Sequence, residues 1–128
     1  MSEKLQGVAT ADAPRAIGPY SQALIAGDLV FVSGQVPLDA ATGEMVSGPF
    51  TNRVRQVLAN VEAVLRAAGS SRDRVVKATV FLTDMGHFVE LNEVYAEFFG
   101  EHRPARSAVQ VTALPRGAEV EIEVVAVR

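Results

Sequence analysis

Two charged residues in the C-terminal part of the sequence have the chemistry to act on a small anion. Arg106 lies at the start of a short β-like segment, in Pro104-Ala105-Arg106-Ser107. A guanidinium is a planar, permanently charged fork that binds a carboxylate through two parallel hydrogen bonds. Glu121 follows in an acidic, apolar segment, where a carboxylate can orient or activate a water molecule.

Both residues also have a purely structural interpretation. Arg106 could form an ion pair with Glu121 or Glu123 on a neighbouring strand, because structural ion pairs are common in folded proteins. Glu121 and Glu123 lie two residues apart and share one side of a strand, as on a solvated edge strand. The residues alone leave ligand binding and structural pairing open.

Two further segments carry groups that can face a cleft. Tyr20 follows the turn residues Gly18-Pro19; its ring usually packs, but a free hydroxyl would donate a hydrogen bond. Ser33 and Gly34 interrupt an apolar strand, and a glycine there indicates a β-bulge or the close approach of another backbone or ligand.

No motif of a metal, thiol or nucleotide enzyme occurs in the sequence. The chain has no Cys and contains no Ser-His-Asp order, HExxH, Walker loop or GxGxxG. His87 and His102 are expected at the surface rather than as a catalytic pair. An enzyme of this composition would work without a metal, a thiol or an obvious His base, through positioning and charge stabilisation.

Length and composition narrow the class of protein. The 128 residues predict one domain, 1–128, and a 48% hydrophobic content is enough to bury a core. A net charge of -3 without a Lys/Arg cluster argues against a nucleic-acid partner. Apolar runs are too short for a membrane span, and the first residues lack a signal-peptide core. These features and the absence of Cys favour a cytoplasmic protein.

Hydrophobic periodicity predicts the elements that must position these residues. A hairpin spans 20–36, with arms at 20–25 and 29–33 and its turn at 26–28, and a loop follows at 37–49. One helix is capped by Thr51 and stops at Gly69. A second helix has Asp84 as its candidate cap, ends at Gly100 and carries the apolar stripe Phe88, Leu91, Tyr95 and Phe98. Further strands are predicted at 75–82, 105–111 and 120–126, with a short one near Val8.

This order of elements predicts a layered architecture. Two strand-helix-strand crossovers imply parallel strand pairs and both helices on one face of the sheet. The other face is too apolar for water, so we expect another subunit to cover it in a closed oligomer. Its expected residues are Phe31, Ser33, Thr79, Phe81, Arg106, Glu121 and Val125.

Seven segments of the sequence resemble the RidA/YjgF family, over residues 13–128. They are IGPYSQA from Ile17, VSGQVP from Val32, RQVLANVEAVLRAAG from Arg55, VVKATVFLTDM from Val75, NEVYAEFF from Asn92, PARSAVQV from Pro104 and VEIEVVAVR from Val120. The resemblance implies a chorismate-mutase-like (YjgF-like) α+β fold, with a mixed β-sheet and two helices packed on one face. It also implies a homotrimeric barrel with clefts between subunits.

The family resemblance further implies cofactor-independent hydrolysis of reactive 2-imino acids and their enamine tautomers to 2-keto acids and ammonia. Position by position, Arg106 would hold the substrate carboxylate and Glu121 would orient or activate water. The remaining cleft residues implied by the match are Tyr20, Ser33, Gly34, Asn92 and Ala108.

Two departures from the family pattern concern the segment around Arg106. Ala108 replaces a Cys found in many members, at a position that contributes mainly backbone, so activity should survive. The link 101–103 before Pro104 is shorter than usual and includes Arg103. A shorter link would widen the cleft and change the preferred substrate.

Two other functions are compatible with the same fold. A non-catalytic module could bind a small carboxylate, such as a keto acid, without turnover. Ribonuclease activity has been attributed to relatives, but the acidic balance of this chain argues against it.

Overall fold

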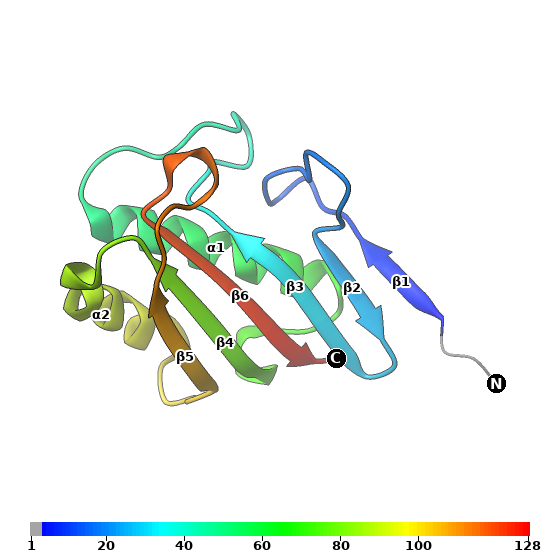
Figure 1. Cartoon of the computed structure of the whole chain (residues 1–128). Coiled ribbons are helices and arrows are strands. Elements are labelled where there is room, and N and C mark those ends of the chain that lie inside the picture. Colours follow the sequence, from blue (N-terminus) through cyan, green and yellow to red (C-terminus); the bar gives the residue numbers. More distant parts are fainter. Residues whose placement is uncertain (1–3) are drawn as a thin grey trace.

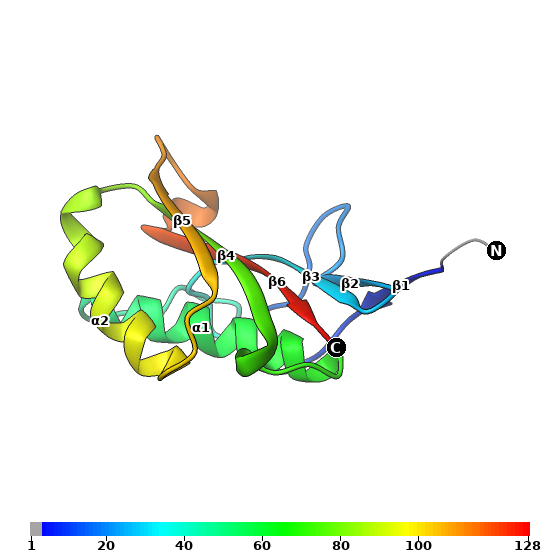
Figure 2. The ribbon, with the colours of Figure 1, turned by 90° about the horizontal axis from the view of Figure 1, so that it is seen from below.

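A computed structural model describes residues 4–128 and contains one six-stranded mixed sheet with two helices on one side (Figures 1 and 2). The strands are β1 (Leu5–Val8), β2 (Ala23–Ala26), β3 (Leu29–Gln35), β4 (Val75–Leu82), β5 (Ala105–Gln110) and β6 (Val120–Val127). The helices are α1 (Phe50–Ala67) and α2 (Phe88–Phe99), with 3₁₀ turns η1 (Arg72–Arg74), η2 (Met85–His87) and η3 (Pro115–Gly117). The α+β fold with both helices on one face is confirmed. Neither described helix is long and apolar enough to cross a membrane.

The strand order is β1-β2-β3-β6-β4-β5, and it corrects one expectation. β6, the last strand in sequence, lies between β3 and β4 and is antiparallel to both. β3 and β4 therefore run in the same direction without pairing, and the predicted parallel pair across α1 was wrong. The crossover through α2 does produce a parallel pair, β4 with β5.

The helices follow the predicted apolar spacing, but both begin differently. α2 begins at Phe88 without a side-chain cap, and Asp84 caps the preceding turn η2 by accepting a hydrogen bond from the Gly86 N–H, so Asp84 as the cap of α2 was wrong.

α1 starts at Phe50 after Pro49, which is extended and makes no side-chain cap, so Thr51 as its cap was wrong. Proline before a helix presets the backbone and loses no helical hydrogen bond. Gly69 ends the helix region with a φ of +82°, as predicted. The buried stripe of α1 faces the sheet and includes Val54, Val57, Leu58, Val61, Val64 and Leu65.

The β2–β3 hairpin reverses at Gly27-Asp28, inside the predicted turn, with Ala26 paired to Leu29. Further along β3 the register with β6 shifts between Val32 and Gln35. A β-bulge at this place is one of the two possibilities that the interrupting glycine indicated.

The face of the sheet away from the helices carries both apolar and polar side chains and is partly exposed. Phe31 pairs with Val125 and is 45% exposed, and Phe81 pairs with Glu121. Arg106 does not lie on this face, which corrects the expectation. Arg106 of β5 pairs with Ala78 of β4, and paired residues of a parallel ladder point to the same side of the sheet. Ala78 is fully buried under the helices, so Arg106 also lies on the helix side.

Candidate functional site

Arg106 lies between strand β5 and helix α2. Its Nη1 donates a hydrogen bond to Oδ1 of Asn92 at 2.8 Å. The guanidinium carbon is 4.8 Å from the ring centroid of Tyr95 and 5.4 Å from that of Phe88. These three residues of α2 are spaced by four and three positions, so they project from the same side of the helix.

The guanidinium charge of Arg106 is not neutralised within the described chain. Among residues 4–128, no carboxylate lies within the 4.0 Å that defines an ion pair with it. The structural alternative, a pair with Glu121 or Glu123, is therefore wrong for this protomer. A guanidinium has five N–H donors, and Asn92 takes one, so a free edge remains for a carboxylate.

Gly34 and Glu121 meet on the open face of the sheet. A Cβ placed on Gly34 would lie 2.7 Å from the carboxyl carbon of Glu121, closer than side chains tolerate. Glycine at the bulge of β3 therefore admits the Glu121 carboxylate directly over the backbone. The sequence suggested the approach of another backbone or a ligand at Gly34, whereas the approaching group is the side chain of Glu121.

The surroundings of Glu121 favour its protonated form. Burial raises the pKa of the Glu121 carboxyl above its ordinary value, and the neighbouring charge of Glu123 raises it further. Such a carboxyl is a stronger base, once ionised, than a fully solvated one.

Ser33 lies in β3, and Tyr20 lies in the segment before β2. The Ser33 hydroxyl donates a hydrogen bond to the backbone oxygen of Ser21 at 2.6 Å, which ties β3 to the segment carrying Tyr20. Tyr20 is 54% exposed and precedes β2. It lines a hollow of about 950 Å³ together with Arg15 and Arg116. That hollow includes neither Arg106 nor Glu121.

Ala108 lies on the same side of β5 as Arg106. It pairs with Val80 and packs against the core beneath the helices. The methyl group of Ala108 forms no hydrogen bonds, so a ligand could bind only its backbone N–H and C=O groups.

Within one protomer the predicted site is divided into two parts. Arg106, Asn92 and Ala108 lie on the helix side of the sheet, whereas Gly34 and Glu121 lie on the open side. Arg106 and Glu121 are two strands and three register positions apart, which separates their Cα atoms by more than about 10 Å. A small molecule cannot touch both parts in this arrangement.

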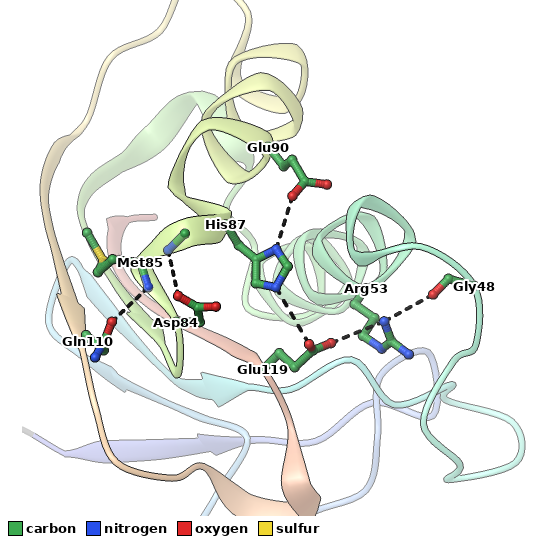
Figure 3. A network of polar contacts seen from close by, with 9 residues as sticks. Gly48, Arg53, Asp84, Met85, His87, Glu90, Gln110 and Glu119 are labelled. Carbon is green, nitrogen blue, oxygen red and sulfur yellow. Dashed lines mark hydrogen bonds and ion pairs between the residues drawn. The ribbon is translucent and has the colours of Figure 1, made fainter.

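A polar network holds Glu119, the residue immediately before β6 (Figure 3). Oε1 of Glu119 forms an ion pair with Nη1 of Arg53 of α1 at 3.2 Å, and its Oε2 lies 3.8 Å from Nε2 of His87. His87 also contacts Glu90 at 3.0 Å and stacks on Phe50. The histidine is therefore partly buried in a structural network, not at the surface as expected.

Two residues beside Arg106 were missed by sequence reasoning. Phe88 and Tyr95 were assigned only to the apolar stripe of the second helix. The spacing of Phe88, Asn92 and Tyr95 carried a signal, because a polar Asn in line with two aromatic rings marks one helix face.

Known proteins of closely similar sequence and structure were found. A RutC family protein of Pyrococcus horikoshii is 53% identical over 117 residues, covering 91% of this chain and 93% of that protein. The human 2-iminobutanoate/2-iminopropanoate deaminase is 45% identical over 121 residues, covering 94% and 88%. The structure of E. coli TdcF with bound serine superposes with a TM-score of 0.92 at 45% identity, covering 96% and 98%.

The family profile described as endoribonuclease L-PSP matches residues 10–128. This match includes every segment that carried the RidA/YjgF resemblance and the whole of β2 to β6. The chain therefore belongs to the endoribonuclease L-PSP family, the family of the RidA/YjgF proteins.

Proposed function

We propose that this protein hydrolyses reactive 2-imino acids and their enamine tautomers to 2-keto acids and ammonia, and so limits metabolite damage. Mammalian relatives at 45–47% identity carry the name 2-iminobutanoate/2-iminopropanoate deaminase, which supports this proposal. The related TdcF structure contains bound serine, and serine carries an α-carboxylate as a 2-imino acid does.

The un-neutralised charge of Arg106 is the observation that carries the proposal. A partly buried arginine without a carboxylate partner is costly unless a ligand supplies one. Asn92 and the two aromatic rings hold the guanidinium without cancelling its charge. The free edge would bind the substrate carboxylate through paired hydrogen bonds.

The separation of Arg106 from Glu121 supports a site shared between protomers. We place Arg106 and Ala108 of one protomer opposite Gly34 and Glu121 of the next, in a homotrimer with three such clefts. The partly exposed apolar face around Phe31 and Val125 would be covered in that assembly. Tyr20 and Ser33 would line the same cleft.

The reaction needs positioning more than a strong nucleophile. Arg106 holds the carboxylate, and Glu121 accepts a proton from water as the oxygen adds to the imine carbon. Glu121 passes this proton to the nitrogen, so the C=N double bond becomes a C–N single bond in an aminol that carries a hydroxyl and an amino group. The hydroxyl proton then moves to the nitrogen as the C=O bond forms and the C–N bond breaks, which releases ammonia and the 2-keto acid.

The proposal is tested by an imine-clearance assay. An amino-acid oxidase generates the imine, semicarbazide competes for it, and 2-keto acid formation is followed. Arg106→Ala should lower kcat/KM by roughly 30- to 5,000-fold, equivalent to about 2–5 kcal/mol. Wild type that clears imine no faster than Arg106→Ala would overturn the proposal.

Arg66→Ala is the matched control. It removes the same charge from the last turn of α1, where the Arg66 side chain is 72% exposed and lies 3.8 Å from Glu62. Clearance should change by less than about twofold, as for most surface substitutions.

The same assay separates the other functions. Keto-acid binding without imine clearance would indicate a carboxylate-binding module. RNA cleavage that depends on Arg106 would support the ribonuclease activity named by the family profile.

A further inference from the structure

We infer that Tyr95 is a positioning residue for Arg106, acting through the face of its ring and not through its hydroxyl. The inference rests on the proposed function, since it concerns how the carboxylate-binding guanidinium is held. It assigns a role to a residue that otherwise belongs to the buried stripe of α2.

The geometry places the cation over the ring. The guanidinium carbon of Arg106 lies 4.8 Å from the Tyr95 centroid, inside the 6 Å or so over which a cation–π attraction is strong. Tyr95 is 8% exposed and packs on Phe99, with ring centroids 4.7 Å apart. Its ring is therefore fixed by the core, and it can fix the guanidinium in turn.

The hydroxyl of Tyr95 does not take part. It is buried and has no hydrogen-bond partner among the described residues. Burial raises the pKa of the Tyr95 phenol, and the nearby Arg106 charge opposes this rise only in part. The phenol thus stays neutral and cannot cancel the arginine charge as a phenolate would.

This arrangement suits an anion-binding arginine. Asn92 fixes one N–H of the guanidinium, and the ring face fixes the position of its charge. Neither contact is a carboxylate, so the full charge and the free edge remain for the ligand. A guanidinium held before the ligand arrives loses less side-chain entropy on binding.

The test measures the Kd for 2-ketobutanoate, a stable carboxylate, and the steady-state constants for imine clearance. Tyr95→Phe keeps the ring and should bind within about twofold of wild type. Tyr95→Leu removes it and should raise Kd by about 3- to 30-fold. KM should rise by a similar factor and kcat should change little, because the contact acts equally on bound substrate and transition state.

Phe50→Leu is the matched control for packing. It removes a buried ring of α1 that stacks on His87 and is not among the rings that contact Arg106 or Tyr95. It should lower the thermal midpoint as Tyr95→Leu does and leave Kd unchanged. If Tyr95→Leu does not fold, Tyr95→Met, which fills the space without a ring, takes its place with the same expectations.

The outcomes are distinct. Weak binding by Tyr95→Leu alone supports the inference. Three results overturn it: Tyr95→Leu binding like wild type, Tyr95→Phe binding as weakly as Tyr95→Leu, or Phe50→Leu weakening binding equally. If wild type and Arg106→Ala bind 2-ketobutanoate equally poorly and clear no imine, the proposed function itself fails.

Discussion

The two faces of the sheet hold their charged residues in opposite ways. On the helix side, Arg106 is held by an amide oxygen and two ring faces that leave its charge intact. On the open side, Glu121 lies against the Gly34 backbone, and burial and Glu123 disfavour its charge. In the proposed reaction, the charge on the helix side would bind the ligand, and the carboxyl on the open side would take a proton as a base.

This difference gives each side a separate function in the proposed reaction. The arginine side would determine binding, and the glutamate side would determine the rate of water addition. Substitutions on the two sides should therefore change different kinetic constants. A substitution on either side that weakened binding and lowered kcat to the same extent would contradict this division.

The largest effect is expected from Glu121→Gln. The amide cannot accept the proton from water, so kcat should fall by about 10²- to 10⁴-fold. Binding of 2-ketobutanoate should stay within about twofold, because Arg106 is untouched. Isothermal titration calorimetry measures the Kd for 2-ketobutanoate, and the clearance assay measures kcat. Loss of binding in this variant would place Glu121 in carboxylate recognition instead.

Gly34→Ala should have an intermediate effect. The added Cβ would lie 2.7 Å from the Glu121 carboxyl carbon and force the carboxylate to move. A displaced base should lower kcat by about 10- to 100-fold. Gly7→Ala is the control, since a Cβ there meets nothing closer than Ser21 Oγ at 3.8 Å. Equal activity of Gly34→Ala and wild type would show that this contact does not position Glu121.

Glu123→Gln should give the smallest effect, a shift in pH dependence. Glu121 acts as a base when ionised, so activity rises as pH increases through its pKa. The Glu123 charge raises that pKa, so its removal lowers the pKa and moves the acid limb of kcat/KM to lower pH. Glu93→Gln removes an exposed carboxylate from α2 and should leave the limb in place. A shift to higher pH in Glu123→Gln would contradict the assignment.

Local features of the fold could be predicted from the sequence. The hairpin turn, the stop at Gly69 and the stripe of α1 depend on neighbouring residues, and the structure confirms them. The place of β6 between β3 and β4 could not be predicted. It depends on contacts between residues far apart in sequence, which periodicity does not encode.

The sequence identified candidate residues for the site but not their arrangement. At Gly34 it indicated a bulge or the approach of another backbone or a ligand; the structure has the register shift of a bulge, and the group that approaches is the side chain of Glu121. The face of Arg106 was missed because it depends on the register of β5 against β4, where a shift of one residue reverses every side chain. Tyr95 was missed because a ring in an apolar stripe looks the same whether or not a cation lies over it.

Mixed assemblies test the shared site most directly. Arg106→Ala and Glu121→Gln are purified separately, each inactive, and then unfolded and refolded together in equal amounts. A cleft that takes Arg106 from one protomer and Glu121 from the next is intact in about one quarter of random neighbouring pairs. The account predicts that imine clearance recovers to about a quarter of the wild-type rate. No recovery from a correctly refolded mixture would contradict it.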